Sequence, residues 1–523
     1  MSFKVIAKKN DLKNGEMKSF NLDESSKVLL CRIDNEYFAV GAACTHYGAP
    51  LEEGILQGNT IICPWHHACF NAKSGNLLEP PAMDALPRYE LKTEGDAILI
   101  DVPVEIPFSR KPDMVKRDNS DKRNYVIIGA GASAYSAAQS MRENGYKGKI
   151  TMITGEGRKP YDRPNLSKDY LAGSAAPEWM PLRPDDFFDE YGIEIMMRTV
   201  IKKVNFKEKT LSTENNEKLK YDKLLIAAGG VPRKLEVPGA ELKNIFYLRS
   251  FDDADEIIEA AKLSKKAIVI GAGFISMEAA HSLTERKIKV TVIAPDNSPF
   301  EKNFGTEIGD LFRKEHEKNG TTFKLKSRVK GFKGNGKVES VLLDSGEEIQ
   351  TDMVIIGIGV VPATKFISGI DLLEDGSIKT DSYMQVSDDV YASGDNASFP
   401  DPRTQEQIRI EHWRLAQQLG RVAGANMAGR KLKYEEVPFF WTDQAGITLR
   451  YAGFVKDWDE IIIDGIVSHK NFIAYYIKNN MIVAAAGMDR DKEIDAVHLL
   501  MKNQKLPDVR SLRENPAGIL SLV

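Results

Sequence analysis

The residues most able to do chemistry lie in one short window, residues 44 to 66. The chain has only four cysteines and eight histidines among its 523 residues, and this window holds Cys44-x-His46 followed by Cys63-x-x-His66. Thiolate and imidazole groups are ligands that suit zinc ions and iron–sulfur clusters. We therefore expect a metal centre bound by two short loops.

The order of these ligands separates two kinds of metal centre. A structural zinc site usually gathers two close cysteines and two close histidines around one ion. Here each loop supplies one cysteine and one histidine, which suits two irons, with both cysteines on one and both histidines on the other. The window, with Pro64 and Trp65 before its last ligand, resembles the Rieske signature in its CPWH form. This resemblance implies a 2Fe–2S cluster bound by Cys44, His46, Cys63 and His66.

Several positions near the ligands refine this resemblance. Respiratory Rieske proteins join their cluster loops by a disulfide, but the corresponding positions here are Ala49 and Trp65. The site therefore resembles the ferredoxin type, with a lower potential. The turn beginning at Gly48 is expected to bring backbone N–H groups toward the cluster sulfurs. His67 stands where such ferredoxins usually have glycine, and we interpret it as a histidine beside the ligands or at the surface, which suits a positive φ less well than glycine does.

The composition indicates the class of protein. Hydrophobic residues make up 42% and charged residues 28% of the chain, and the net charge is −4, which argues against nucleic-acid binding. No stretch approaches about eighteen consecutive apolar residues, and the first residues form no apolar signal segment. We expect three or four domains, no membrane span and a cytoplasmic location.

Residues 1–103 predict a small all-β domain. Short apolar stretches bounded by Gly, Asn and Pro predict strands, at Val28–Ile33, Tyr37–Val40, Thr60–Ile62 and Ala97–Val102. Residues 104–122 are rich in proline and charge and have no apolar period. They predict a semi-extended linker.

A glycine-rich turn between a strand and a helix follows this linker. Strand Tyr125–Ile128 leads into the turn, a helix ends near Asn144, and strand Lys149–Ile153 comes next. Glycines at such a turn let the backbone approach a pyrophosphate at the helix N-terminus, and an acidic residue after the second strand accepts from a ribose hydroxyl. The expected dinucleotide contacts are Gly129, Gly131, Ser133, Ala134 and Glu156.

A second turn repeats this pattern. Strand Ala267–Ile270 leads into it, a helix runs to about Arg286, and strand Lys289–Ile293 follows. Because each unit holds one dinucleotide, the pair predicts one flavin and one nicotinamide dinucleotide. The alternative is that the glycines only permit close packing of helix and strand. The expected contacts of the second unit are Gly271, Gly273, Phe274 and Ile275.

From about residue 123 to its end, the chain resembles flavoprotein reductases with two dinucleotide sites, in particular apoptosis-inducing-factor-like and ferredoxin-reductase-like enzymes. The segments that carry the resemblance are Tyr161-Asp162-Arg163-Pro164, Ala227-Ala228-Gly229, Gly357-Ile358-Gly359, Ser393-Gly394-Asp395, Glu411-His412-Trp413 and Phe440-Trp441-Thr442-Asp443. The resemblance implies cofactor contacts from Arg163, Lys168, Ala228, Gly229, Arg233, Gly359, Asp395, Glu411, His412, Trp413 and Trp441.

Together the two halves imply a multidomain fold. An N-terminal all-β Rieske domain would precede α/β two-dinucleotide-binding domains of the glutathione-reductase type and a C-terminal α+β domain. The FAD-binding domain would comprise residues 123–243 and 366–434, and the NAD-binding domain residues 244–365. Residues 435–523 would form the C-terminal domain, through which relatives commonly make dimer contacts, so that a homodimer is expected.

The same resemblance assigns catalytic roles. Lys168 would stabilise negative charge on reduced flavin and pair with Glu278, and Phe274 would stack on the nicotinamide ring. The alternatives are a surface salt bridge and ordinary core packing. Asp296, shortly after the second unit's last strand, is placed to accept from a ribose 2′-hydroxyl, which favours NADH over NADPH.

These features predict an oxidoreductase that passes electrons from NADH through FAD to its own Rieske cluster, and across the exposed histidine edge of the cluster to an external acceptor. That acceptor would be an oxygenase component, a haem protein or a quinone. No cysteine follows Cys69, which excludes disulfide reductases, and the remaining histidines lack the paired spacing of an oxygenase iron site. The alternative function is an apoptosis-inducing-factor-like redox sensor that binds NADH, turns over slowly and signals.

Overall fold

The first hundred residues form an all-β domain in the computed structural model, which describes residues 3–523. Three antiparallel sheets make it up, with the strand orders β2-β3-β4-β9, β1-β11-β10 and β5-β6-β7-β8. The strands predicted for this region match β3, β4, β6 and β11 to within one residue at each end. The bounds are β1 Phe3–Lys8, β2 Met17–Asn21, β3 Lys27–Ile33, β4 Glu36–Gly41, β5 Ile55–Gln57, β6 Thr60–Ile62, β7 Cys69–Asn71, β8 Leu77–Glu79, β9 Arg88–Tyr89, β10 Leu91–Glu94 and β11 Ala97–Asp101.

The first dinucleotide-type unit builds a sheet of six strands in the order β14-β13-β12-β18-β31-β30. Its strands are parallel except for β30, and they are apolar because helices cover the sheet. The last strands and α8 come from residues far along the chain, so this domain is discontinuous in sequence. The bounds are β12 Asn124–Ile128, α1 Ala132–Glu143, β13 Lys149–Ile153, α2 Asp169–Ala172, α3 Asp185–Glu190, β14 Ile193–Met196, β18 Lys223–Ile226, β30 Gln385–Ser387, β31 Val390–Ala392 and α8 Trp413–Met427.

The second unit forms a parallel sheet of five strands in the order β20-β27-β21-β22-β23. A short antiparallel pair, β19 with β28, joins it to the first unit. The bounds are β19 Gly230–Pro232, β20 Ile245–Phe246, α4 Phe251–Lys262, β21 Lys266–Ile270, α5 Phe274–Glu285, β22 Lys289–Ile293, α6 Glu301–Phe304, α7 Thr306–Lys318, β23 Thr322–Lys324, β27 Met353–Ile356 and β28 Val360–Pro362.

Smaller antiparallel sheets decorate these two units. The first unit carries β15-β16-β17 and β29-β32-β33, and the second carries β24-β25-β26. The bounds are β15 Ile201–Asn205, β16 Thr210–Thr213, β17 Lys218–Lys220, β24 Val329–Lys333, β25 Ser340–Leu343, β26 Glu348–Gln350, β29 Ile378–Lys379, β32 Ala397–Pro400 and β33 Gln407–Ile408.

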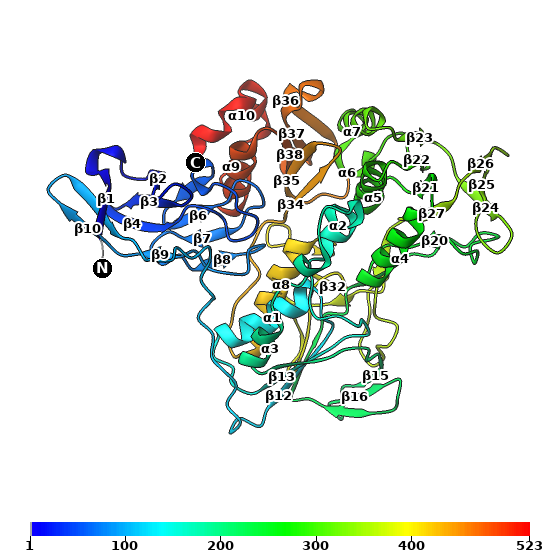
Figure 1. The fold of residues 1–523 in the computed structure, drawn as a ribbon, viewed down its shortest axis with the longest axis horizontal. Coiled ribbons are helices and arrows are strands. Elements are labelled where there is room, and N and C mark those ends of the chain that lie inside the picture. Colours follow the sequence, from blue (N-terminus) through cyan, green and yellow to red (C-terminus); the bar gives the residue numbers. More distant parts are fainter. Residues whose placement is uncertain (1–2) are drawn as a thin grey trace.

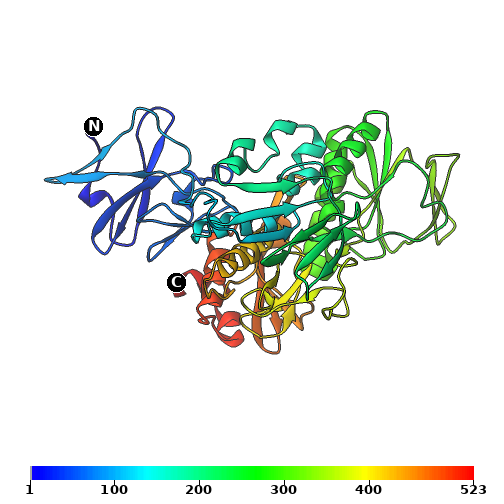
Figure 2. The ribbon, with the colours of Figure 1, turned by 90° about the horizontal axis from the view of Figure 1, so that it is seen from below.

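The last part of the chain is an antiparallel sheet in the order β34-β35-β38-β37-β36, followed by helices. In the ribbon, the all-β domain lies at one end of the molecule and the second unit at the other, and α9 and α10 stand next to the all-β domain (Figure 1). The view from below keeps the same order along the long axis (Figure 2). The bounds are β34 Phe439–Gln444, β35 Ile447–Gly453, β36 Glu460–Ile466, β37 Asn471–Lys478, β38 Met481–Met488, α9 Asp491–Lys502 and α10 Val509–Glu514.

No helix within residues 3–523 has both the length and the apolar character that a membrane crossing requires.

The packing of α8 against α1 is unusually close. A β-carbon built on Gly420 would lie 2.2 Å from the carbonyl oxygen of Ser133, and one built on Gly424 would lie 2.3 Å from that of Ala137. Only glycine allows the two helix backbones to approach in this way. Because α1 begins directly after the first glycine-rich turn, this contact also fixes that turn.

We expect Gly420→Ala to destabilise the fold, because the added methyl group must push α8 away from α1. Overpacking of this kind costs about 1–3 kcal/mol. Thermal unfolding followed by circular dichroism should show a midpoint several degrees below that of the unchanged protein. Gly518→Ala is the matched control, since its nearest neighbours belong to the movable side chain of Asn515. Equal midpoints for both variants would refute the close-packing argument.

Candidate functional site

The four predicted metal ligands come together at the tips of two loops of the all-β domain. Cys44 and His46 follow β4, and Cys63 and His66 follow β6. The Nδ1 atoms of the two histidines lie 3.1 Å apart, close to the separation of about 3.4 Å expected for two nitrogen ligands of one tetrahedral metal. Both cysteines are 1% exposed and neither forms a disulfide.

The protonation states of these side chains suit a metal centre. Burial lowers the pKa of His46 to about 4 and lowers that of His66 well below its usual value, so both rings are neutral at pH 7, the form in which imidazole binds a metal. The Cys63 thiol and burial raise the pKa of Cys44, while a hydrogen bond from Cys44 lowers the pKa of Cys63. The protein alone thus favours one thiol beside one thiolate, and a bound metal would be needed for both sulfurs to act as thiolate ligands.

Backbone N–H groups point at both sulfurs. Those of His46 and Tyr47 face the Cys44 sulfur, and those of Trp65 and His66 face the Cys63 sulfur. The turn at Gly48 has φ +78° and its N–H bonds instead to the carbonyl oxygen of Cys44, at 2.9 Å. The expected sulfur contacts of this turn thus come from the residues just before it. Donors of this kind tune the potential of a cluster.

His67 is neither a ligand nor a surface residue. Its side chain is 1% exposed, its φ is +59°, and its Nδ1 lies 2.6 Å from Oδ1 of Asp495, a residue of α9 that is 2% exposed. The surface interpretation was wrong because it could not include a partner from the far end of the chain. Burial lowers the pKa of His67 and raises that of Asp495, so the pair shares one proton without carrying free charge.

The histidine edge of the centre faces the reductase part of the chain. The rings of His66 and Trp441, a residue of β34, have centroids 4.2 Å apart, and His412 lies 5.2 Å beyond Trp441. The ring of Tyr47 stacks on His46 at 3.9 Å, and its hydroxyl donates to Asp162 of the Tyr-Asp-Arg-Pro segment. The two rings are half-buried, so the histidine edge is less exposed than expected, because Trp441 of β34 lies against it.

The first glycine-rich turn fits a dinucleotide. Gly129 has φ +125°, and a β-carbon there would lie 2.2 Å from the carbonyl oxygen of Ala227. Gly131 is the N-cap of α1, and a β-carbon built on it meets nothing within 4 Å, which leaves the helix N-terminus open to a pyrophosphate. Ser133 and Ser393 join the two flavin motifs through their hydroxyl groups, which are 2.6 Å apart.

The second turn has the same form. Gly271 has φ +107° and lies against the carbonyl oxygen of Gly357, while Gly273 is the open N-cap of α5 and Gly359 has φ +99° with free space around it. Asp296 pairs with Lys302 at 3.1 Å. Ile275, at the start of α5, is 37% exposed.

Lys168 and Glu278 form an ion pair in a sheltered position. Glu278, on α5, is 9% exposed, and its carboxylate accepts hydrogen bonds from Ser167 at 2.6 Å and from Thr442 at 3.3 Å. These bonds satisfy the carboxylate, which lowers the cost of burying the pair. The structure thus excludes an ordinary surface salt bridge at this position. Phe274 packs between Phe300, at 4.9 Å, and Phe440, at 5.4 Å.

The remaining predicted residues fall into two groups. In the first, Glu156 accepts from Arg163 at 2.7 Å and from Tyr161 at 2.6 Å, and Asp395 pairs with Arg249 at 2.8 Å. The second group makes none of the contacts described above. Glu411 pairs with Arg409, and the side chain of Arg233 is exposed. Ala228 and Gly229 follow β18, and Trp413 is the first residue of α8.

Sequence reasoning missed the residues that fasten the all-β domain to the reductase part. Arg414, which is fully buried, donates to the carbonyl oxygens of Pro80 at 2.9 Å and His67 at 3.1 Å, and Arg450 donates to that of Trp65 at 2.9 Å. The partners are backbone atoms, which carry no signal in the sequence.

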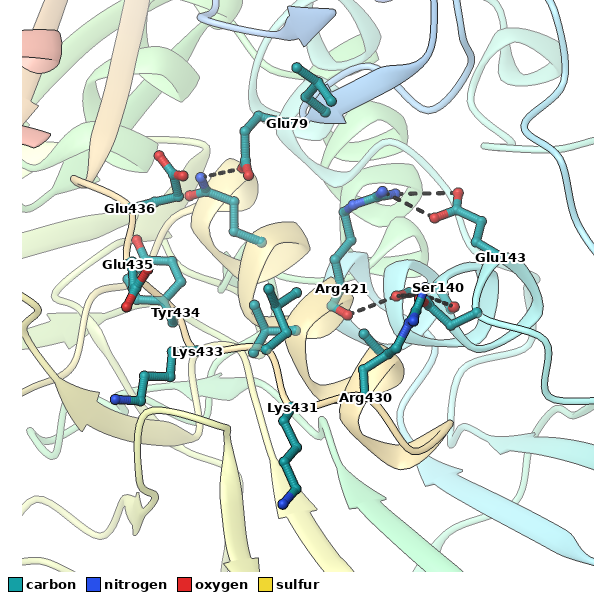
Figure 3. A pocket seen from close by; sticks show the side chains of 16 residues that line it. Glu79, Ser140, Glu143, Arg421, Arg430, Lys431, Lys433, Tyr434, Glu435 and Glu436 are labelled. Carbon is teal, nitrogen blue, oxygen red and sulfur yellow. Dashed lines mark hydrogen bonds and ion pairs between the residues drawn. The ribbon is translucent and has the colours of Figure 1, made fainter. Parts of the chain in front are cut away.

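A pocket of about 720 Å³ lies at the rim of this interface, between β8, α1, α8 and residues 430–436. Figure 3 shows its side chains: Gln418 donates to Glu79, and Arg421 pairs with Glu143. Arg421 and Glu143 are the one ion pair among the charged lining residues that the structure describes, and Glu436 pairs with Lys502 outside the pocket. None of the predicted cofactor or metal residues lines the pocket.

Comparisons with known proteins agree with this geometry. Residues 2–90 match the Rieske 2Fe-2S domain, residues 123–420 match the pyridine nucleotide-disulphide oxidoreductase family, and residues 439–521 match the reductase C-terminal domain. The chain is 35% identical over 499 residues to "Apoptosis-inducing factor 3" of Homo sapiens, covering 93% of this chain and 82% of the relative. It is 31% identical to "Rubredoxin-NAD(+) reductase" of Ectopseudomonas oleovorans, covering 73% of this chain and 99% of the relative.

The fold agrees as well. The crystal structure of the covalent putidaredoxin reductase–putidaredoxin complex superposes with a TM-score of 0.72 and 26% identity, covering 77% of this chain and 98% of that one. The expected fold class and the expected cluster, FAD and NAD cofactors are thereby confirmed. The chain belongs to the pyridine nucleotide-disulphide oxidoreductase family, as a ferredoxin-reductase-like, FAD-dependent NAD(P)H oxidoreductase with its own Rieske domain.

Proposed function

We propose that one chain contains the whole route from NADH to a Rieske cluster held by Cys44, His46, Cys63 and His66. The observation that carries this proposal is the contact of Trp441 with the ligand ring of His66, at 4.2 Å between centroids. Trp441 belongs to β34, and the next residues of that strand contact the Lys168–Glu278 pair. The metal ligands and the proposed flavin-side residues are therefore neighbours through one strand.

FAD, when bound, accepts a hydride from the nicotinamide and gives up its electrons singly, which a one-electron cluster requires. The chain's own residues supply the electrostatics. The Lys168 cation would stabilise negative charge on the reduced ring, and the Glu278 carboxylate balances that cation in its sheltered position. Phe274, at the start of α5, shapes the nicotinamide side of this site.

The coenzyme preference follows from Asp296. Asp296 lies shortly after the end of β22. There its carboxylate can accept from a ribose 2′-hydroxyl but would repel a 2′-phosphate. Lys302 neutralises part of this charge, and with 84% of its side chain exposed it is a weak clamp. The proposed coenzyme is therefore NADH and not NADPH.

The external acceptor takes up electrons one at a time, and it is an oxygenase component, a haem protein or a quinone. Named relatives support this class, since they include a rubredoxin-NAD(+) reductase and a dioxygenase ferredoxin–NAD(+) reductase component. A homodimer through the C-terminal domain and a cytoplasmic location complete the proposal.

Electron paramagnetic resonance on the anaerobic protein tests the function. One equivalent of NADH should produce the signal of a reduced Rieske cluster as the flavin absorbance bleaches. His46→Cys should abolish that signal and leave flavin bleaching in place, because the histidine ligation is lost while the flavin site is untouched. Flavin that bleaches beside an oxidised cluster would instead favour the slow NADH sensor.

Glu278→Gln should slow reduction of the flavin by NADH. The amide cannot balance the charge of Lys168 or hold its ammonium group in place, so that the stabilisation of the reduced ring is partly lost, at a cost of about tenfold to a hundredfold in rate. Stopped-flow measurement of flavin bleaching checks this. Glu285→Gln, on the same helix but 51% exposed, is the control. Equal rates in the two variants would contradict the role of the pair.

A further inference from the structure

His67 occupies a position that its own loop does not favour. Its φ of +59° lies in the left-handed region, which residues other than glycine adopt uncommonly, although histidine does so more often than most. Its ring is nevertheless 1% exposed. A costly conformation of this kind persists only when surrounding contacts determine it. Contacts around His67 must therefore hold it in this conformation.

The hydrogen bond and the aromatic contacts of the ring come from outside the all-β domain. Asp495 of α9 bonds to Nδ1 at 2.6 Å, the ring stacks on Phe439 at 4.6 Å with an angle of 24° between the planes, and His498 packs on it at 4.0 Å. Arg414 of α8 donates to its carbonyl oxygen at 3.1 Å. The metal loop is thus seated in a pocket of the reductase part.

The partners of the two neighbouring histidines lie two residues apart on one strand. His67 stacks on Phe439, and His66 packs on Trp441. Residues i and i+2 of a strand point to the same face, so both aromatic rings belong to the same face of β34. Seating His67 on the first ring therefore sets the place of His66 on the second.

We propose that His67 is a positioning residue, which fixes the Rieske domain on β34 and α9 so that His66 stays against Trp441 throughout turnover. The proposal rests on the proposed function, to which it adds that transfer occurs within one chain and without movement of the domain. Two other polar contacts between the domains are more open to water: Tyr47, which bonds to Asp162, is 52% exposed, and the side chain of Asp84, which pairs with Arg183, is 19% exposed. The bond from Arg414 to Pro80 is buried, as the His67 contacts are.

Three variants separate the role of the side chain from that of the backbone. His67→Gly removes the anchor but suits the positive φ better than histidine does. His67→Asn tolerates this φ and keeps a side-chain N–H donor. Asp495→Ala removes the partner of His67 from a helix that is remote in sequence from the metal ligands. This variant remains informative if changes at residue 67 lower the cluster content. Iron analysis measures the cluster content of each variant.

Hydrogen exchange of the oxidised holoprotein gives the first readout, and it needs no electron transfer. Amides of residues 60–70 and 491–502 should exchange at least about tenfold faster in His67→Gly and in Asp495→Ala, because undocking becomes frequent. His67→Asn should stay close to the unchanged protein. Residues 266–285, in the second unit, serve as the internal control and should not change.

The rate of cluster reduction after mixing with NADH gives the second readout. It should fall by about tenfold to a hundredfold in Asp495→Ala while flavin bleaching keeps its rate, because misplacement by about 1 Å is enough for such a loss. Unchanged exchange at 491–502 in Asp495→Ala and His67→Gly would overturn the proposal. A cluster that NADH does not reduce even in the unchanged protein would refute the proposed function and leave the exchange result standing.

Discussion

The contact of two consecutive histidines with one face of β34 is the interaction on which the rest of the structure depends. His66 and His67 meet Trp441 and Phe439, while Phe440, on the opposite face, meets Phe274 of the nicotinamide unit. A strand alternates its side chains between two faces, so one short strand can touch both halves of an electron path. The all-β domain therefore packs on one face of β34, and the nicotinamide unit packs on the other.

Burial acts differently on the two ends of this path. It makes the histidines of the metal loops neutral, and neutral imidazole is the form that binds iron. At the flavin end, Lys168 and Glu278 are sheltered as a pair, and the hydroxyl groups of Ser167 and Thr442 bond to the carboxylate. A charge can remain there because its partner and these bonds replace water.

Much of this arrangement could be predicted from the sequence. The glycine turns, the metal ligands and the Lys168–Glu278 pair lie in segments whose spacing carries the chemistry, because a tight turn or a bound metal restricts which residues can stand there. The bounds of β13 and β22 agree with the prediction residue by residue.

The way in which the domains meet could not be predicted. His67 and Asp495 are 428 positions apart, and Arg414 and Arg450 bond to backbone oxygens, so no local pattern marks any of these contacts. The histidine edge was expected at the surface for the same reason: a loop sequence says which metal it binds but not which strand covers it. Tertiary packing determines both the contacts between the domains and the cover over the histidine edge.

The most direct test of this account is the rate at which the cluster is reduced after rapid anaerobic mixing with NADH, measured at several protein concentrations. Transfer within one chain predicts a first-order rate that does not change on dilution. At equal flavin content this rate should fall by at least about tenfold in Trp441→Leu, because the aromatic ring that contacts His66 is removed. Trp179→Leu, at a position 73% exposed, should match the unchanged protein. A rate that falls in proportion to dilution, or one that Trp441→Leu leaves unaltered, would contradict the account.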